Sequence, residues 1–377
     1  MWIPERASGL VSLTAVKAGA LVNSFRTPRS WVLLLAGLGW LGAAGTASGA
    51  LPADYWNDPA GFFERQAQVS LASASDLLAK YPPGIGASVE RRGALTMLDQ
   101  LLHDEAAARR PAVQEFLRAR FRQALGQRRT TRVAHGATVW KLYDHTFVLR
   151  TSTVTLAFDL TRAGSAGVES FRVPEEIIRE MVEQCDVLFV SHLHKDHADE
   201  EVARLFLAQG KPVIAPVGVW ADREIHNQVT HLHREPEIIQ VLALQKGLPG
   251  LKVTVFPGHQ RVVENNVVLI TTAEGLRICH TGDQNEPKDH GWLDQIGASQ
   301  ATDILLVNCW SPDLGRLIRG SKARLVIPGH ENELGHVVLH REPYWLTADR
   351  LSHFGPVNSV IMTWGEKFHY ERAPQAP

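Results

Sequence analysis

Residues 187–197 limit what this chain can fold into more than any other stretch. An apolar run is followed at once by four side chains that can bind metal: His192, His194, Asp196 and His197. The run has the length of a buried strand, which places the polar segment in the loop at the strand's end. Alternate residues of an extended segment point to the same side. The first two histidines can therefore converge on one ion, and the last two residues can reach a second. A solvated histidine-rich turn, the alternative, gives no structural reason for so many ligands.

Three more candidate ligands stand alone after later apolar runs. They are His259, Asp283 and His330, and each directly follows a glycine. Glycine lets a chain turn sharply and approach a neighbour closely, so each of these side chains can reach a site at the end of a strand. His280 competes with His259 as a ligand, but it lies within an apolar run and is expected to point into the core.

The motif His-x-His-x-Asp-His at 192–197, followed by His, Asp and His in that order, resembles the metallo-β-lactamase superfamily over about residues 135–365. The elements Thr281-Gly282-Asp283 and Pro328-Gly329-His330 are most similar to the branch that contains ascorbate-6-phosphate lactonase and N-acylphosphatidylethanolamine phospholipase D. The resemblance implies an α/β fold, a four-layer αββα sandwich, here with an N-terminal helical extension.

The same resemblance implies a site for two divalent metal ions. The ligands of the first ion would be His192, His194 and His259. The ligands of the second ion would be Asp196, His197 and His330. Asp283 would bridge the two ions, and Asp159, after an early strand, would support the ligand loop rather than bind metal. Imidazole and carboxylate ligands favour Zn²⁺, and Mn²⁺ or Fe²⁺ can use the same set.

Two ions held close together can activate a shared water molecule as the nucleophile, with Asp196 as a catalytic residue that orients it or carries a proton. The expected activity is hydrolysis of an ester-like bond in a small-molecule or lipid-like substrate, with phosphodiesters favoured and lactones second. Asp283 stands where many zinc β-lactamases have Cys or Ser, which disfavours β-lactam hydrolysis. The alternatives are an iron-dependent oxidoreductase on the same scaffold and a catalytically silent metal-binding protein.

Composition excludes some functions and suggests a location. The 377 residues carry a net charge of −1, so no nucleic-acid partner is expected. The three cysteines are too few for a disulfide framework and are expected to be buried thiols, although a bridge is not excluded by spacing. Arg26 and Arg29 precede an apolar run at 31–44 and a small-residue cleavage site near Ala50. We expect an exported protein, periplasmic or secreted, or alternatively one anchored to the membrane by residues 31–44.

Three regions follow from these patterns. Residues 1–50 are predicted to be a signal peptide or membrane anchor, residues 51–132 a helical extension, and residues 133–377 the catalytic domain. In the extension, apolar spacing predicts helices over 62–78, 91–108 and 111–125, the last ending at Gly126. The arginines at 118–132 are expected to form a solvated helix face, with an anionic contact as the alternative.

The catalytic region is predicted to contain short strands, the last over 359–363. Its remaining histidines are expected to be peripheral. The pair His231 and His233 copies the His-x-His spacing, but no strand leads into it, so the segment 216–249 is expected to be surface or lid. Three later histidines are expected on the surface or lining the pocket: His336, His340 and His353.

Overall fold

The computed structural model describes residues 58–164, 167–355 and 357–372. The predicted signal peptide or anchor, residues 1–50, lies outside them. All the described residues belong to one compact unit. Among the described residues, no helix combines the length and the apolar character that crossing a membrane requires.

The first of two mixed sheets contains six strands in the order β12-β1-β2-β3-β4-β5. Their bounds are β1 Ala137–Lys141, β2 Phe147–Arg150, β3 Thr155–Phe158, β4 Val187–Phe189, β5 Val213–Ile214 and β12 Glu366–Tyr370. Strands β12, β1, β2 and β3 pair antiparallel, and β3, β4 and β5 pair parallel. The parallel half therefore brings the ends of β3 and β4 to the same edge.

The second sheet also has six strands, in the order β11-β10-β9-β8-β7-β6. Their bounds are β6 Gln240–Leu242, β7 Leu251–Gln260, β8 Val263–Thr271, β9 Arg277–His280, β10 Ile304–Asn308 and β11 Leu325–Gly329. Strands β6 to β9 pair antiparallel, whereas β9, β10 and β11 are parallel. The ends of β9 and β11 thus also lie at one edge.

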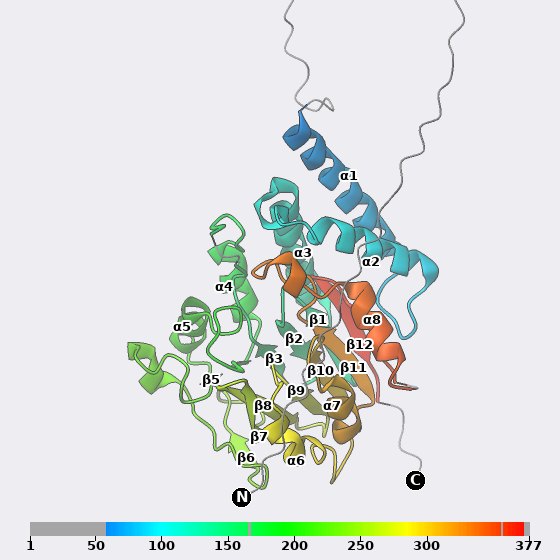
Figure 1. Cartoon of the computed structure of the whole chain (residues 1–377). Helices are drawn as coiled ribbons and strands as arrows, with labels where there is room; N and C mark the ends of the chain where they lie inside the picture. Colours follow the sequence, from blue (N-terminus) through cyan, green and yellow to red (C-terminus); the bar gives the residue numbers. More distant parts are fainter. Residues whose placement is uncertain (1–57, 165–166, 356, 373–377) are drawn as a thin grey trace, which may run out of the picture. The chain divides into compact units, whose positions relative to one another are not determined.

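A core of buried side chains joins the two sheets, with members on both: Phe147, Leu149, Leu156, Val253, Ile270 and Ile304. Fully burying one such side chain contributes about 1.5–3 kcal/mol. Helices cover the outer faces: α4 Glu175–Glu183, α5 Glu200–Ala208, α6 His290–Leu293, α7 Leu314–Ser321 and α8 Tyr344–Ser352. Helix α5 packs on β4 and β5, and α7 packs on β10, with the sheets between them (Figure 1). The predicted αββα sandwich is confirmed.

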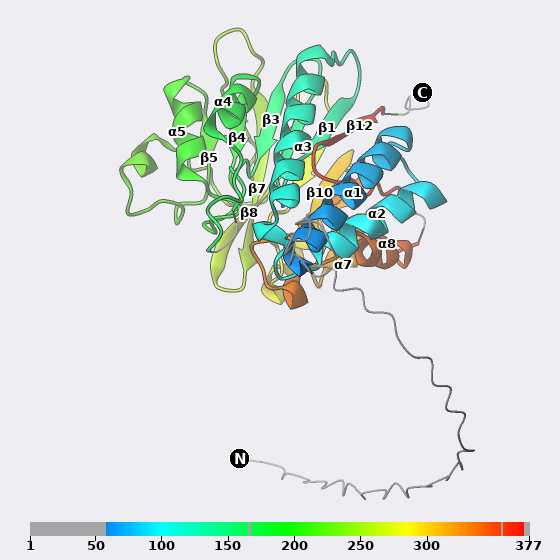
Figure 2. The same ribbon diagram turned by 90° about the horizontal axis from the view of Figure 1, so that it is seen from above.

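Three long helices precede the sandwich: α1 Pro59–Lys80, α2 Val89–Leu102 and α3 Pro111–Thr130. Single 3₁₀ turns are η1 Ala107–Arg109, η2 Glu224–Gln228, η3 Pro287–Asp289 and η4 Val338–His340. Figure 2 shows α1 and α2 on the same side of the molecule as α8, and α2 contacts α8 directly. The side chains of these helices share one buried cluster with the sandwich.

Two predicted helix ends are wrong. The helix expected over 91–108 ends at Leu102, because the Asp104 carboxylate accepts a hydrogen bond from the Ala106 amide and so stabilises a turn in place of the helix. Gly126 lies inside α3 and does not end it. The helix continues because Gln127 accepts a hydrogen bond from the Trp140 indole, and this contact ties its last turns to β1.

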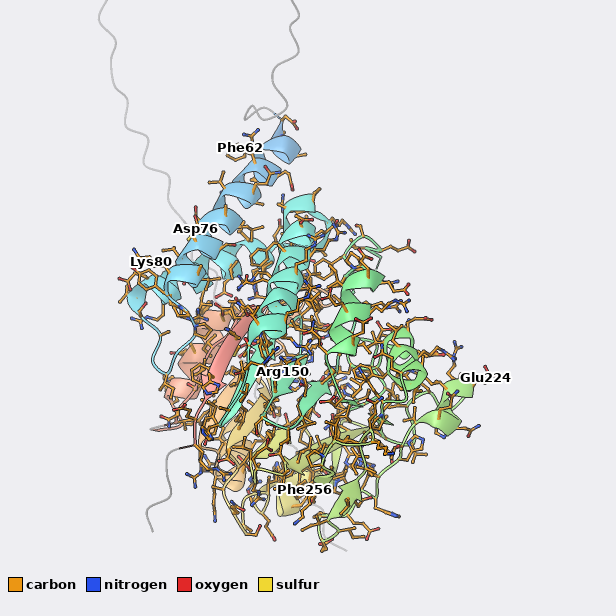
Figure 3. The ribbon with its side chains drawn as sticks, turned by 180° about the vertical axis from the view of Figure 1, so that it is seen from behind. Phe62, Asp76, Lys80, Arg150, Glu224 and Phe256 are labelled. Carbon is orange, nitrogen blue, oxygen red and sulfur yellow. The ribbon has the colours of Figure 1, made fainter. Side chains whose placement is uncertain are left out.

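The arginines of α3 are not all solvated, contrary to the prediction. Arg120 and Arg128 are buried. The Arg120 guanidinium donates to the Trp364 carbonyl, and that of Arg128 donates to the Gln184 carbonyl. Arg150 on β2 is labelled in Figure 3. Its guanidinium donates to the carbonyls of Arg128 and Thr131 at the end of the helix. These cations join α3 to the sandwich.

The last strand lies later than predicted. Around Ser359 there is only an isolated bridge to Val326, and the true edge strand is β12. Gly365, at φ 75°, turns the chain, and its amide donates to the Lys141 carbonyl at 2.7 Å. Positive φ suits glycine, so this turn carries the chain from the second sheet to the edge of the first.

Candidate metal centre

All candidate ligands except His259 come from loops at the ends of parallel strands. Asp159 follows β3, and the 192–197 segment follows β4 in the same sheet. In the facing sheet, Asp283 follows β9 by three residues and His330 follows β11 directly. Both sheets thus deliver their polar loops to one edge of the sandwich.

The first pair of histidines meets as the alternation predicts. His192 Nε2 lies 3.0 Å from His194 Nδ1. Two ligand atoms that each lie ~2.05 Å from one tetrahedral ion are about 3.3 Å apart. The two ring nitrogens are therefore spaced as ligands of a single ion would be.

A second group forms around His197. Its Nε2 lies 3.0 Å from His330 Nε2 and 3.2 Å from Asp196 Oδ2. Ligand atoms of Asp144, Asp196, His197 and His330 all lie within 4.8 Å of one another. The separations of 3.0 and 3.2 Å from His197 Nε2 again match the spacing of ligands around one ion.

Asp283 lies between the two groups. Its Oδ2 is 3.8 Å from His192 Nε2 and 3.5 Å from His197 Nε2. Its Oδ1 is 3.0 Å from His330 Nε2. Asn308 donates to Oδ1 at 2.7 Å and Gln260 donates to Oδ2 at 2.8 Å, which holds the carboxylate in this orientation.

His259 differs from the prediction in its position. It lies inside β7, paired with Glu264, rather than after the strand's end. Its Nδ1 lies 3.1 Å from both carboxylate oxygens of Asp289. Among the described residues, no group of three or more converging ligands includes His259. The Asp289 contact nevertheless leaves Nε2 as the free ring nitrogen, the arrangement that carboxylate–histidine–metal triads use.

Asp159 holds the loop that carries the motif. Its Oδ1 accepts from the Ser191 amide at 2.7 Å, and its Oδ2 lies 2.7 Å from His197 Nδ1. A ligand histidine is oriented by such a contact to its other nitrogen. Asp159 therefore lies where a supporting group would lie. His280, the competitor of His259, stacks on Phe158 with 4.9 Å between ring centroids and points into the core.

Sequence reasoning missed two residues in the turn between β1 and β2. Asp144, at φ 61°, has its Oδ1 2.6 Å from His330 Nδ1, and its carbonyl accepts from the His330 amide. The next residue, His145, is fully buried against His280, with 4.4 Å between ring centroids. The only sequence signal was a polar pair in a tight turn between two apolar runs, a place where Asp tolerates positive φ.

The electrostatics of the cluster favour positive charge. Burial lowers the pKa of the His197 imidazole, but the carboxylates of Asp283 and Asp196 outweigh it and raise this pKa well above its ordinary value. His330 behaves alike: burial opposes protonation, yet Asp144 and Asp283 raise its pKa. A divalent ion can take the place of these protons, because metal binding requires neutral imidazole and releases protons. The His and Asp clusters are therefore consistent with a metal site.

Glycine is required before Asp283. Gly282 has φ +49°, and a Cβ there would lie 2.2 Å from Asn265 Oδ1 and 2.5 Å from Ser191 Cβ. Any larger residue would push the Asp283 loop away from the loop of the His-x-His motif. The glycine before the ligand is thus explained by close approach.

A cavity of about 880 Å³ opens onto this cluster. Its lining includes Asp196 and Asp283 together with seven basic or imidazole side chains: His194, Lys195, Arg261, His336, His340, Arg341 and Arg350. Two of the three later histidines thus line the pocket, while His353 is 70% exposed elsewhere.

The His231–His233 pair gathers no converging ligand group among the described residues. All three cysteines are buried and free, as predicted.

Comparison with known proteins agrees with the fold. Residues 139–328, half of the chain, match the family described as the Beta-lactamase superfamily domain. The chain therefore belongs to the metallo-β-lactamase superfamily. No curated protein that was compared matches it.

Some solved structures match this chain at low identity. One is Igni18, a metallo hydrolase from Ignicoccus hospitalis, with 15% identity, a TM-score of 0.46 and coverage of 63% of this chain and 99% of that one. A possible metal-dependent hydrolase from Veillonella parvula has 14% identity, a TM-score of 0.47 and coverage of 63% and 100%. The diiron β-hydroxylase CmlA from Streptomyces venezuelae has 13% identity, a TM-score of 0.45 and coverage of 64% and 55%.

Proposed function

We propose that this protein is a dinuclear metal-dependent hydrolase of ester-like bonds. The observation that carries the proposal is the position of Asp283, which lines the cavity and whose carboxylate lies within 4 Å of a histidine from each ligand group. A carboxylate between two histidine groups is the arrangement that a pair of bridged ions requires.

The ligand assignment follows the two groups. The first ion would be held by His192, His194 and His259. The second ion would be held by Asp196, His197 and His330. Asp283 would bridge the two ions, and Asp159 would keep His197 in its ligating orientation. The donor set of imidazoles and carboxylates suits Zn²⁺, with Mn²⁺ or Fe²⁺ as the other candidates.

When bound, the metals would activate water and polarise the substrate oxygen. The chain's own groups have distinct tasks. Asp196, 24% exposed and open to the cavity, accepts a proton from the attacking water or orients it. Gln260 and Asn308 keep the Asp283 carboxylate fixed through their amide groups.

The charge of the cavity supports an anionic substrate. Lys195, Arg261 and Arg350 line the wall with positive charge. Glu342 Oε1 lies 3.0 Å from the Arg350 guanidinium. Burial raises the pKa of this carboxyl to about 7, so it is only partly ionised at neutral pH and offsets only part of the positive charge. Phosphodiesters are therefore favoured over neutral lactones, which remain second. The exposed Val262 and Leu339, each 92% exposed, also line the cavity and suit an apolar or lipid-like portion of the substrate.

A substrate panel tests the proposal. The full chain, loaded with Zn²⁺ or Mn²⁺, is assayed on phosphodiesters, lactones and simple carboxylic esters, before and after removal of metal with a chelator. We expect phosphodiester turnover that disappears with the chelator and returns with metal. Oxygen consumption with iron and no hydrolysis would favour the oxidoreductase alternative, and metal binding without turnover would favour a silent metal-binding protein.

We also propose export of the protein, on the strength of the charged and apolar pattern of residues 1–50. Mass spectrometry of the protein from cell fractions tests this. A mature chain that begins near residue 51 in the periplasm or medium is expected, whereas an intact chain in the membrane fraction would support the anchor over 31–44.

A further inference from the structure

Glu333 connects the metal cluster to a histidine that the ligand set does not use. Its Oε2 lies 3.1 Å from His330 Nδ1 and 2.9 Å from His336 Nδ1. The Glu333 side chain is 5% exposed, so water does not screen these contacts. A single oxygen of this buried carboxylate therefore lies beside the Nδ1 atoms of two imidazoles.

Nδ1 is the buried ring nitrogen of His336. It lies 2.9 Å from Glu333 Oε2 without the geometry of a hydrogen bond, whereas the side chain as a whole is 39% exposed. His336 lines the same cavity as Asp196 and Asp283, and Nε2 is the ring nitrogen that the Glu333 contact leaves free. A carboxylate at Nδ1 and a free Nε2 is the arrangement of an oriented acid–base histidine.

Glu333 also sets the charge of this ring. The Glu333 contact is the largest influence on His336 and raises the pKa of the imidazole, while partial burial opposes this.

We propose that His336 is the general acid that protonates the leaving group, with Glu333 as its positioning residue. The inference rests on the proposed hydrolase function and deepens it. As the oxygen of water bonds to phosphorus or carbon, the bond to the leaving oxygen breaks and its electron pair stays on that oxygen. His336 Nε2 gives the leaving oxygen its proton. Asp196 or solvent takes the proton from water, and solvent returns one to His336 through the open side of the cavity.

A series of leaving groups tests the role, because an acid matters most when the leaving oxygen is strongly basic. Substrates of the reactive class are compared with 4-nitrophenyl, phenyl and alkyl leaving groups, in metal-loaded wild type, His336→Ala and Glu333→Gln. General acid catalysis contributes about 10²–10⁴-fold. We expect His336→Ala to lose on the order of 10²-fold or more in kcat with alkyl leaving groups, but less than about tenfold with 4-nitrophenol. Glu333→Gln is expected to fall between wild type and His336→Ala.

Two readouts do not depend on turnover. Metal content by emission spectrometry should be unchanged in His336→Ala, since His336 is not a ligand. Histidine ¹⁵N NMR should show a protonated Nδ1 at His336 that shifts in Glu333→Gln. His353→Ala is the matched control, because His353 also lies beside a carboxylate, Asp349, but is exposed outside the cavity.

Equal losses with all leaving groups, or loss of metal in His336→Ala, would overturn the assignment of His336 while leaving the hydrolase proposal intact. If His336→Ala does not fold, the leaving-group dependence of Glu333→Gln decides, and a flat dependence overturns the proposal. A wild-type enzyme that carries its metals but hydrolyses no ester-like substrate would overturn both proposals together.

Discussion

The ion pair between Lys141 and Glu331 provides a stringent test of how the sandwich supports the metal centre. Both side chains are 0% exposed, and Lys141 Nζ on β1 donates to Glu331 Oε2, next to His330. The other oxygen, Glu331 Oε1, is buried without a hydrogen-bond partner among the described residues. Changing Lys141→Met would leave the whole carboxylate unpaired in the core.

The expected magnitude follows from this burial. Removing one partner of a buried pair costs about 3–5 kcal/mol, whereas replacing both with apolar residues is often neutral or stabilising. We expect Lys141→Met and Glu331→Leu each to lower the free energy of unfolding by about 3–5 kcal/mol, and the double variant to lose much less than their sum. The coupling energy should be at least about 2 kcal/mol, within the range for residues in one network.

Urea denaturation followed by tryptophan fluorescence measures these free energies, with all variants treated identically for metal. Arg179→Met is the control, since Arg179 pairs with Glu175 on the exposed face of α4, where a pair contributes less than about 1 kcal/mol. Additive losses in the double variant would refute the reasoning, because they would mean that the two charges do not stabilise each other.

Three further predictions concern other sites. Burial raises the pKa of the Asp99 carboxyl to about 6. Between pH of about 4 and 6 the native state therefore binds more protons than the unfolded state. The stability that the protonated Asp99 contributes is present at low pH and is lost as the pH rises through this window. Relative to Asp99→Asn, the free energy of unfolding of the wild type should fall by up to about 3 kcal/mol over that window in urea titrations. A difference between the two proteins that does not change with pH would contradict the raised pKa. Gly282→Ala should lower metal affinity and activity at least tenfold, while Gly291→Ala, with nothing within 4 Å of its added Cβ, should not. Asp159→Asn should weaken metal binding about 10–100-fold in competition with a chelator, and wild-type affinity would show that Asp159 does not orient His197.

The sequence was sufficient to predict the fold and the meeting of most candidate ligands. The reason is that Asp159, the 192–197 segment and His330 each follow a strand whose neighbour is parallel, so the strand ends must share an edge. His259 was placed incorrectly because the β7–β8 hairpin continues pairing past Gly258, which no local residue pattern announces.

Other features depended on contacts between distant parts of the chain. Asp144 and Glu333 converge on His330 from different loops, and neither stands at a spacing typical of a ligand. Helical periodicity identified the apolar face of α3, but it could not show that Arg120 and Arg128 reach carbonyl groups on segments that pack there later in the chain. Long polar side chains can bury their aliphatic part while the charged end makes hydrogen bonds. A prediction from residue type alone therefore gives them too much exposure to solvent.

The ratio of metal to protein tests the central claim most directly. Emission spectrometry of the purified full chain, saturated with Zn²⁺ or Mn²⁺ and then freed of excess ion, should give about two ions per chain. Asp283→Ala should lower this ratio below one ion per chain, because it removes the carboxylate that lies between His192 and His197. One ion or none in the wild type, or an undiminished ratio in Asp283→Ala, would contradict a bridged pair of metals.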